Sequence, residues 1–249
     1  MSDQPNTNAE QPYKEAKREP VFKLPLVIVA IVAVLTTIHI ALQLGGLAWQ
    51  NWSQYVFAFI PARFGPGIFP QISGSAYWSM LTYGMLHADW MHLGFNSLWL
   101  IIFSKPVVLR LGTWRYLALL AISVVAGAIA GLIMHWGQFV VMVGISAGVS
   151  GMIAAAIPVM YAGNRQMGLA DEVQMASLRP LRPLEIIQNR QALIFTLMWL
   201  VLTMFTATSQ YLTGTAFLEE RVIAWEAHLG GFIAGLISFY LLDRTRNSQ

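Results

Sequence analysis

The stretch Gly144-Ile145-Ser146-Ala147-Gly148-Val149-Ser150-Gly151 places two serines at the start of an apolar run that continues to Tyr161. Its glycines and alanine carry little side chain, so a neighbouring helix or a bound peptide can approach the backbone closely. The pattern therefore predicts a tightly packed helix with a serine in its first turn. A serine hydroxyl is a weak nucleophile until a base takes its proton. Any chemistry here needs a base and hydrogen-bond donors from elsewhere in the chain.

The composition is that of a membrane protein. Of the 249 residues, 56% are hydrophobic and only 11% are charged, whereas about 25% are charged in an ordinary soluble domain. The lipid bilayer is therefore an expected partner. The formal net charge of +3 is small and lies at the ends of apolar segments, so nucleic acid is not an expected partner. The lack of cysteine excludes disulfides, a thiol nucleophile and a cysteine-ligated metal.

Apolar segments divide the chain into a tail, a membrane domain and a second, short tail. Residues 1–21 are polar and predict a disordered cytoplasmic tail, residues 22–243 form the membrane domain, and residues 244–249 are a cytoplasmic C-terminal tail. A transmembrane helix needs about 20 predominantly apolar residues, and six segments of the domain approach or meet this length. The expected spans are 24–44, 78–103, 114–134, 146–161, 192–208 and 225–242.

Residues 47–77, between the first two expected spans, are rich in aromatic residues but interrupted by prolines and glycines. Such a segment is too interrupted to span the bilayer, and its aromatic rings favour the membrane interface. The prediction is an all-α integral membrane protein, a bundle of six transmembrane helices with an interfacial loop between helices 1 and 2.

The positions of lysine and arginine give the expected orientation. All of the 15 basic residues except Arg63 and Arg221 fall on one side of the six-span arrangement, and basic loops face the cytoplasm. Both termini are then cytoplasmic, and we expect a multi-pass protein of a bacterial inner membrane. In this topology the second, fourth and sixth spans all begin near the outer face, where their polar residues would meet.

Three polar side chains lie just inside the second and sixth expected spans. His92 and Asn96 are four residues apart and share a helix face. His228 precedes two glycines, four residues apart, that offer a close approach to a neighbouring helix. If that neighbour is the fourth span, His228 lies beside Ser146 and can take its proton, while Asn96, His92 and a backbone N–H stabilise an oxyanion. Polar groups inside spans are costly, and are therefore candidates for function.

These residues give the sequence a resemblance to the rhomboid family of intramembrane serine proteases, over roughly residues 25–243. The resemblance rests on the order, spacing and shared membrane side of four pieces. They are His87, His92 and Asn96 at the start of the second span, Leu111-Gly112 after it, the serine stretch, and His228 with Gly231 and Gly235. It implies cleavage of the transmembrane helices of substrate proteins by a Ser–His dyad, without a metal or cofactor. Carried over, His228 is the base, and His92 and Asn96 stabilise the oxyanion.

Two serines compete for the role of nucleophile. The usual motif of the family, Gly-x-Ser-Gly, matches Gly148-Val149-Ser150-Gly151, whereas Gly144-Ile145-Ser146-Ala147 ends in alanine. A longer form, which resembles Gly-Ala-Ser-Gly-Ala-Val-Ser-Gly-Met, aligns without a gap and puts Ser146 first. Ser146 also lies nearer the outer end of its helix by about 6 Å, which matches the depth of His228. We expect Ser146 to be the nucleophile, with Ser150 as the alternative.

Several positions depart from the family pattern. Ser150 stands where many relatives have an aromatic residue that stacks on the histidine, and Ala147 puts a Cβ beside the nucleophile. Ser79 replaces an arginine before the second span, and Val108 replaces a glutamate ahead of Arg110. The first two departures favour a second hypothesis, a catalytically inactive rhomboid-like protein that binds or escorts transmembrane helices. The last two weaken the expectation of how the interfacial loop is fixed.

Other patterns have other interpretations. Residues 144–148 also match the G-x-S-x-G turn of soluble α/β hydrolases, but that fold needs several buried strands that this chain does not offer. A metal site formed by His87, His92 and His228 is a further alternative, disfavoured because the spans contain no carboxylate, and a transporter would need deeper polar residues. His39 and His135 are expected to be packed or interfacial, and Glu226 solvated at a helix start. His87 either orients the oxyanion region or lies at the interface. Substrate and oligomeric state are not predicted.

Overall fold

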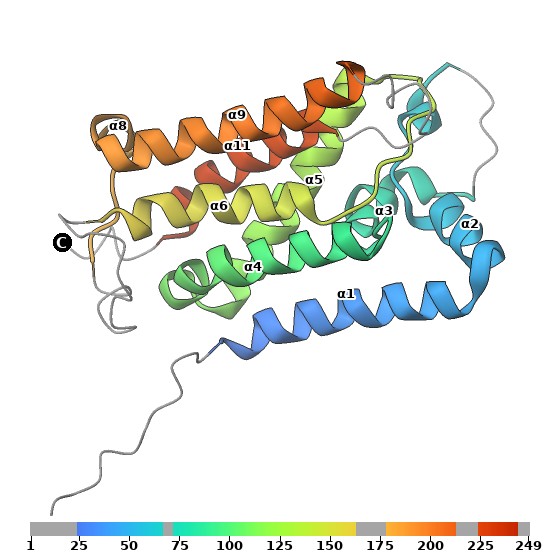
Figure 1. The fold of residues 1–249 in the computed structure, drawn as a ribbon, viewed down its shortest axis with the longest axis horizontal. Coiled ribbons are helices and arrows are strands. Elements are labelled where there is room, and N and C mark those ends of the chain that lie inside the picture. Colours follow the sequence, from blue (N-terminus) through green and yellow to red (C-terminus); the bar gives the residue numbers. More distant parts are fainter. Residues whose placement is uncertain (1–23, 67–71, 163–177, 213–223, 244–249) are drawn as a thin grey trace, which may run out of the picture.

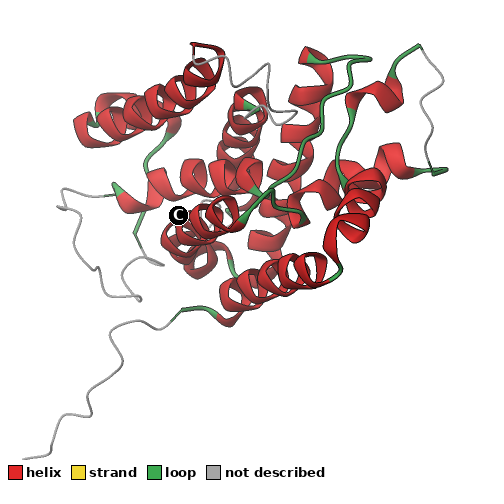
Figure 2. Cartoon of the chain, turned by 45° about the vertical axis from the view of Figure 1, so that its right-hand side comes forward, coloured by secondary structure: helices red, strands yellow, loops and turns green. Residues whose placement is uncertain are grey.

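The computed structural model describes residues 24–66, 72–162, 178–212 and 224–243. The tails predicted for 1–21 and 244–249 lie outside the described residues. Figure 2 shows helices joined by loops, and the β interaction found within the described ranges is an isolated antiparallel bridge between Phe59 and Met142. The all-α membrane fold predicted from the sequence is confirmed, and the soluble hydrolase alternative is wrong.

Within the described residues, six apolar helices correspond to the six expected spans. Four of them are long and apolar enough to cross a membrane: α1 (Leu26–Leu44), α4 (Trp90–Leu111), α5 (Thr113–Met134) and α11 (Trp225–Leu242). The other two helices have shorter apolar stretches. They are α6 (Ser146–Met160) and α9 (Arg190–Leu212), whose apolar stretch ends at Phe205. These helices are consistent with a six-span bundle (Figure 1).

Short helices connect the apolar ones. The segment expected as an interfacial loop contains a helix of its own, α2, which packs against α1 and α3. The short elements are α2 (Gly46–Phe57), η1 (Pro61–Phe64), α3 (Ser75–Thr82), η2 (Tyr83–Met85) and α8 (Pro183–Gln188).

The second span begins close to the polar residues that mark its start in the sequence. The sequence predicts it within residues 78–103, opening at His87, and the chain turns after η2 so that a new helix, α4, starts at Trp90. Asp89 caps this helix, because its side chain accepts a hydrogen bond of 2.8 Å from the backbone N–H of His92. Such a cap satisfies one of the free N–H groups of a helix start. At the other end, α4 runs on to Gly112, whose φ of +77° ends the helix.

The central helix of the bundle is α6. It packs against α4, α5 and α11, and all residues from 147 to 159 are buried. A methyl group at Gly231 would lie 2.1 Å from the carbonyl oxygen of Ala147, and one at Gly235 would lie 2.3 Å from the Cα of Gly151. The two backbones touch, which confirms the small-residue face predicted for the sixth span. In Figure 1, α4, α6 and α11 all begin at the same end of the bundle, here called the site end.

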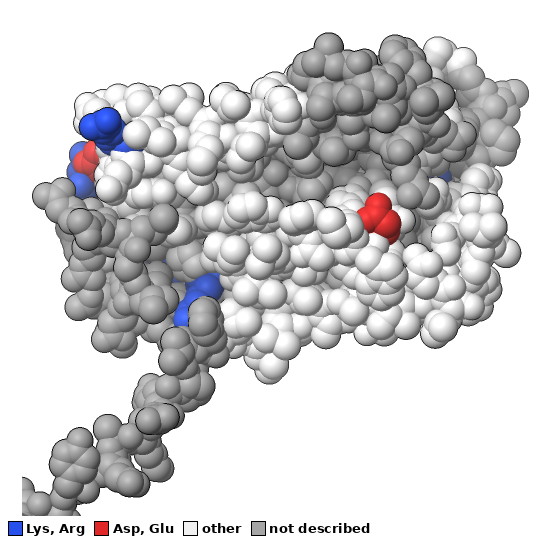
Figure 3. Space-filling view, viewed as in Figure 1, with Lys and Arg blue, Asp and Glu red and all other residues white. Residues whose placement is uncertain are grey.

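The surface fits a lipid environment. In the view of Figure 3, the visible charged side chains lie to either side of a wide uncharged band. Large hydrophobic side chains are exposed along α1 and α9, among them Leu26, Val29, Leu197 and Val201. Apolar surface of this extent marks a membrane contact, so the protein is an integral membrane protein.

Candidate catalytic site

Ser146 and His228 meet at the site end of the bundle. Nε2 of His228 lies 2.8 Å from Oγ of Ser146, a hydrogen-bond distance at which the imidazole can accept the hydroxyl proton. Ser146 is the first residue of α6, and His228 is the fourth residue of α11. The backbone contact between Gly231 and Ala147 brings the two helix starts together. The structure thus unites the serine and the histidine that the sequence proposes as a pair.

Ser150 makes a different contact. Its hydroxyl donates a 2.8 Å hydrogen bond to the carbonyl oxygen of Ser146, one turn earlier in the same helix. This back-bonding satisfies a serine inside a helix, and the side chain is buried at 4% exposure. Ser150 is therefore engaged within α6, whereas Ser146 faces the histidine.

Gly144 lies two residues before Ser146 and faces the two expected oxyanion donors on α4. Its φ is +112°, a conformation that favours glycine. A methyl group here would lie 2.7 Å from Nε2 of His92 and 3.6 Å from Nδ2 of Asn96, so the close approach also requires glycine. The Asn96 side chain is buried, and its Nδ2 has no hydrogen-bond partner within the described residues. A donor held free beside Gly144, two residues before Ser146, is suited to a developing oxyanion.

Hydrogen bonds hold the segment that leads to Ser146. The N–H of Gly144 donates to the carbonyl of Tyr83 at 3.0 Å, and the Tyr83 hydroxyl donates to the carbonyl of Val124 in α5 at 2.8 Å. Two residues earlier, Met142 exchanges backbone hydrogen bonds of 2.9 and 3.1 Å with Phe59 of the interfacial segment. The approach to the serine is thus tied to α5 and to the residues after α2.

An arginine that the sequence interpretation did not single out fixes the interfacial segment. The buried guanidinium of Arg63 donates to the carbonyl of Ala58 at 2.9 Å and to the carbonyl of Tyr55. Position 79, where many relatives have an arginine, is a serine here and cannot make such contacts. Arg63 makes them from within the interfacial segment instead. The sequence does mark Arg63 by its position, because it is one of only two basic residues that fall on the expected outer side of the membrane.

His87 lies in the loop before α4 and adjoins the oxyanion side. Its ring meets that of His92 edge-on, with ring centres 5.2 Å apart and planes at 69°. Burial above all, and then the charges of His92 and His39, lower the pKa of His87 to about 3. The imidazole is therefore neutral near pH 7.

Glu226 is not the solvated helix-start charge expected from the sequence. Its carboxylate is buried and lies 2.9 Å from Nε2 of His135, at the end of α5. The acid closest in sequence to His228 is thus bound to another histidine. In the described ranges, no group of three or more His, Asp or Glu side chains is arranged to hold a metal ion.

One comparison with known proteins gives a match. A protein-family model described as Rhomboid domain matches residues 74–245, more than half of the chain. The matched region begins at the start of α3 and contains Ser146, His228, His92 and Asn96, while α1 and α2 precede it. A search of curated protein sequences found no match.

Proposed function

Because the chain belongs to the rhomboid family, we propose that it is an intramembrane serine endopeptidase that cleaves transmembrane helices near the outer face of the membrane. The observation that carries this proposal is the 2.8 Å contact between Nε2 of His228 and Oγ of Ser146. In this proposal Ser146 is the nucleophile, His228 is the general base, and His92 and Asn96 stabilise the oxyanion. Transmembrane substrate proteins are the partners.

The proposed reaction follows from these positions. His228 takes the hydroxyl proton through Nε2 while Oγ of Ser146 bonds to the substrate carbonyl carbon, and the carbonyl oxygen becomes an anion. Asn96 and His92 then donate hydrogen bonds to that oxygen. When the intermediate collapses, the C–N bond breaks and His228 gives its proton to the leaving amine. Water, deprotonated by the same histidine, hydrolyses the acyl ester and releases Ser146.

A dyad rather than a triad fits the surroundings of His228. The neighbouring Glu226 carboxylate is engaged by His135, so it does not orient the catalytic imidazole in this proposal. Packing does so instead, since Gly231, one turn after His228, touches the backbone of α6. A base held by packing needs no carboxylate to keep its geometry.

The substrate class follows from the physics of helices in lipid. A transmembrane helix bonds all of its backbone internally, so a peptide bond becomes accessible only after local unwinding. Substrates are therefore expected to have glycine, proline or small residues near the outer end of their span. They reach the site sideways from the bilayer.

Separate Ser146→Ala and Ser150→Ala variants test the nucleophile. With a purified enzyme and a substrate helix in liposomes, Ser146→Ala is expected to lower kcat by on the order of 10³-fold or more. Ser150→Ala loses only a hydrogen bond within α6 and retains most of the activity. Cleavage that survives in both variants would rule out a serine mechanism, and loss in Ser150→Ala alone would reverse the assignment.

A fluorophosphonate probe separates the protease from the inactive helix-binding alternative. The probe labels a serine only when a base activates it, so the wild type is expected to be labelled and His228→Ala is not. Substrate that crosslinks to an unlabelled wild type without cleavage would favour the binding protein instead.

A further inference from the structure

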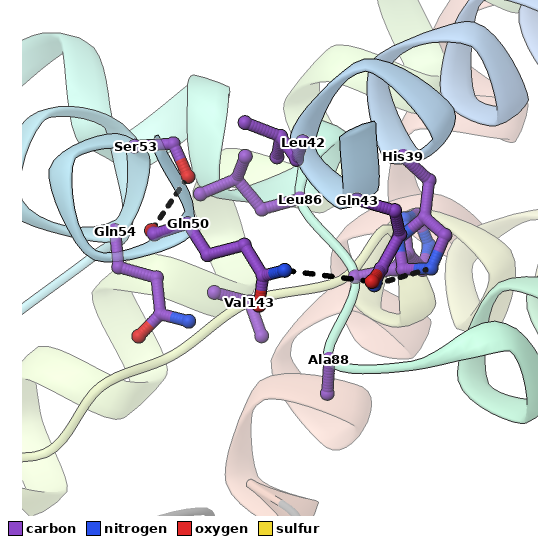
Figure 4. A pocket seen from close by; sticks show the side chains of 10 residues that line it. His39, Leu42, Gln43, Gln50, Ser53, Gln54, Leu86, Ala88 and Val143 are labelled. Atoms are coloured by element: carbon purple, nitrogen blue, oxygen red, sulfur yellow. Dashed lines mark hydrogen bonds between the residues drawn. The ribbon is translucent and has the colours of Figure 1, made fainter. Parts of the chain in front are cut away.

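A polar pocket lies beside the candidate site, between α1, α2 and the segment that leads into α4 (Figure 4). Its volume is about 20 Å³, and a cavity of roughly 10–15 Å³ has room for one water molecule. Polar groups near a membrane interior are costly unless hydrogen bonds satisfy them. The polar lining consists of His39, Gln43, Gln50, Ser53, Gln54 and His87.

One wall of the pocket is a connected chain of side chains, drawn with dashed lines in Figure 4. Nε2 of Gln50 donates to Oε1 of Gln43 at 3.4 Å, and Nε2 of Gln43 lies 3.4 Å from Nε2 of His39. Ser53 donates to the carbonyl of Gln50 at 2.8 Å. The two side-chain contacts are long, and amide groups have further donors and acceptors to offer.

His87 lines the pocket and is nine-tenths buried, at 8% exposure. Burial lowers the pKa of the ring and the backbone of Met85 lies close enough to oppose part of this lowering, but neither ring nitrogen makes a hydrogen bond of good geometry among the described residues. A neutral imidazole has one donor and one acceptor to satisfy, and buried polar groups in proteins are satisfied by protein or by ordered water. A pocket of this size with several polar walls supplies that water site.

His87 also joins the pocket to the oxyanion side of the candidate site. Its ring is in edge contact with that of His92, and His92 in turn lies against Gly144. Val143, which lines the pocket, directly precedes Gly144. Whatever fixes the ring of His87 therefore limits where the ring of His92 can lie.

We propose that this pocket binds an ordered water molecule that hydrogen-bonds to His87, and that His87 held in this way is a positioning residue for His92. The second half of this inference rests on the proposed function, in which His92 stabilises the oxyanion. Water suits the lining better than a metal ion, because the polar groups are amides, a hydroxyl and two histidines, without a carboxylate.

Two variants test the positioning role in the full chain, reconstituted in liposomes. His87→Phe keeps a ring for the edge contact but removes both nitrogens, and Gln50→Leu removes part of the polar wall while leaving His87 in place. Each is expected to lower kcat by about tenfold with KM unchanged, less than the roughly 10²–10³-fold expected for a lost oxyanion donor. Asn51→Leu is the matched control, because Asn51 is exposed on α2 outside the pocket, and it leaves kcat unchanged.

The double variant and an experimental density map complete the test. If both residues act through one water, His87→Phe with Gln50→Leu is no worse than either alone. If the losses of kcat in the two single variants multiply in the double variant, or if Gln50→Leu leaves kcat unchanged, the positioning role is overturned. If His87→Phe does not fold, the kcat of Gln50→Leu alone decides the question. Density for water within hydrogen-bond distance of a His87 nitrogen supports the site, and an empty pocket overturns it. The density map does not depend on enzymatic activity, so a protein that holds the water but cleaves no substrate would contradict the proposed function and not the water site.

Discussion

The methyl group of Ala147 faces α5 and leaves the oxyanion donors clear. A methyl group at Gly127 of α5 would lie 2.4 Å from the Cβ of Ala147, so the alanine fills the space that this glycine leaves. The donors His92 and Asn96 are on α4 and approach Gly144 instead. The Cβ of Ala147 packs against α5, whereas the donors His92 and Asn96 lie on α4. Helix packing therefore explains an alanine at this position. It carries little weight for the inactive hypothesis.

The pair formed by Glu226 and His135 gives a prediction at the same scale. Glu226→Ala leaves the histidine without its 2.9 Å partner, and a hydrogen bond to a charged group contributes about 1.5–3 kcal/mol. The free energy of unfolding, measured by reversible denaturation in detergent, is expected to fall by about that amount. Adding His135→Ala to Glu226→Ala is expected to cost little more, since the pair is already broken. Fully additive losses would show that the two side chains do not interact.

Packing between α6 and α11 gives a prediction at the scale of elements. Gly235→Ala puts a methyl group 2.3 Å from the Cα of Gly151, and overpacking of this kind costs about 1–3 kcal/mol. The strain separates two helices that carry Ser146 and His228, so both stability and kcat are expected to fall. Gly94→Ala in α4 is the matched control, because a methyl group there meets nothing within 4 Å. Equal stability of the two variants would contradict the close contact.

The sequence indicates some elements well and others poorly, for physical reasons. The starts of α6 and α11 are predicted because small residues and polar side chains mark them. The sequence places the start of the second span at His87, close to the first residue of α4, but the helix that precedes it, α3, is not separated from it by hydropathy, and the cap that Asp89 provides is seen only in the structure. Arg63 bonds to backbone carbonyls, which every residue carries, so its unusual position among the basic residues marks it in the sequence but does not give its partners. The pairing of Ser146 with His228 follows from order and spacing, whereas the pocket at His87 depends on three-dimensional packing.

An ion pair joins distant parts of the chain at the end of the bundle opposite Ser146. Nη2 of Arg110, at the end of α4, lies 3.0 Å from Oδ2 of Asp243, and both side chains are almost fully buried. Arg110 also donates to the carbonyl of Leu178 at 2.6 Å. Many relatives have a glutamate where this chain has Val108. Here the carboxylate beside Arg110 is that of Asp243, 133 residues after Arg110. This pair fixes α4, α11 and the segment before α8 to one another.

Breaking that pair tests its weight for the whole molecule. Asp243→Asn removes the carboxylate that lies 3.0 Å from the buried Arg110 guanidinium, and the loss of one partner of a buried ion pair costs about 3–5 kcal/mol. The midpoint of denaturation in detergent is expected to fall, while kcat per folded molecule stays close to wild type, because the pair lies at the C-terminal ends of α4 and α11 and Ser146 at the N-terminal end of α6. Replacing both partners with apolar residues recovers part of the loss. A large drop in kcat without a loss of stability would instead link this end of the bundle to catalysis.

The orientation of the whole chain in the membrane is open to a direct test, because the protein has no cysteine. All basic residues but Arg63 and Arg221 lie on one side of a six-span arrangement, and transfer of such loops across the membrane is disfavoured. We predict that Ser2→Cys and Ser248→Cys react with a membrane-impermeant maleimide only after the membrane is permeabilised. Ser73→Cys, exposed before α3, is expected to react in intact cells. Labelling of either tail from outside would invert the topology, and would put Ser146 and His228 at the cytoplasmic face.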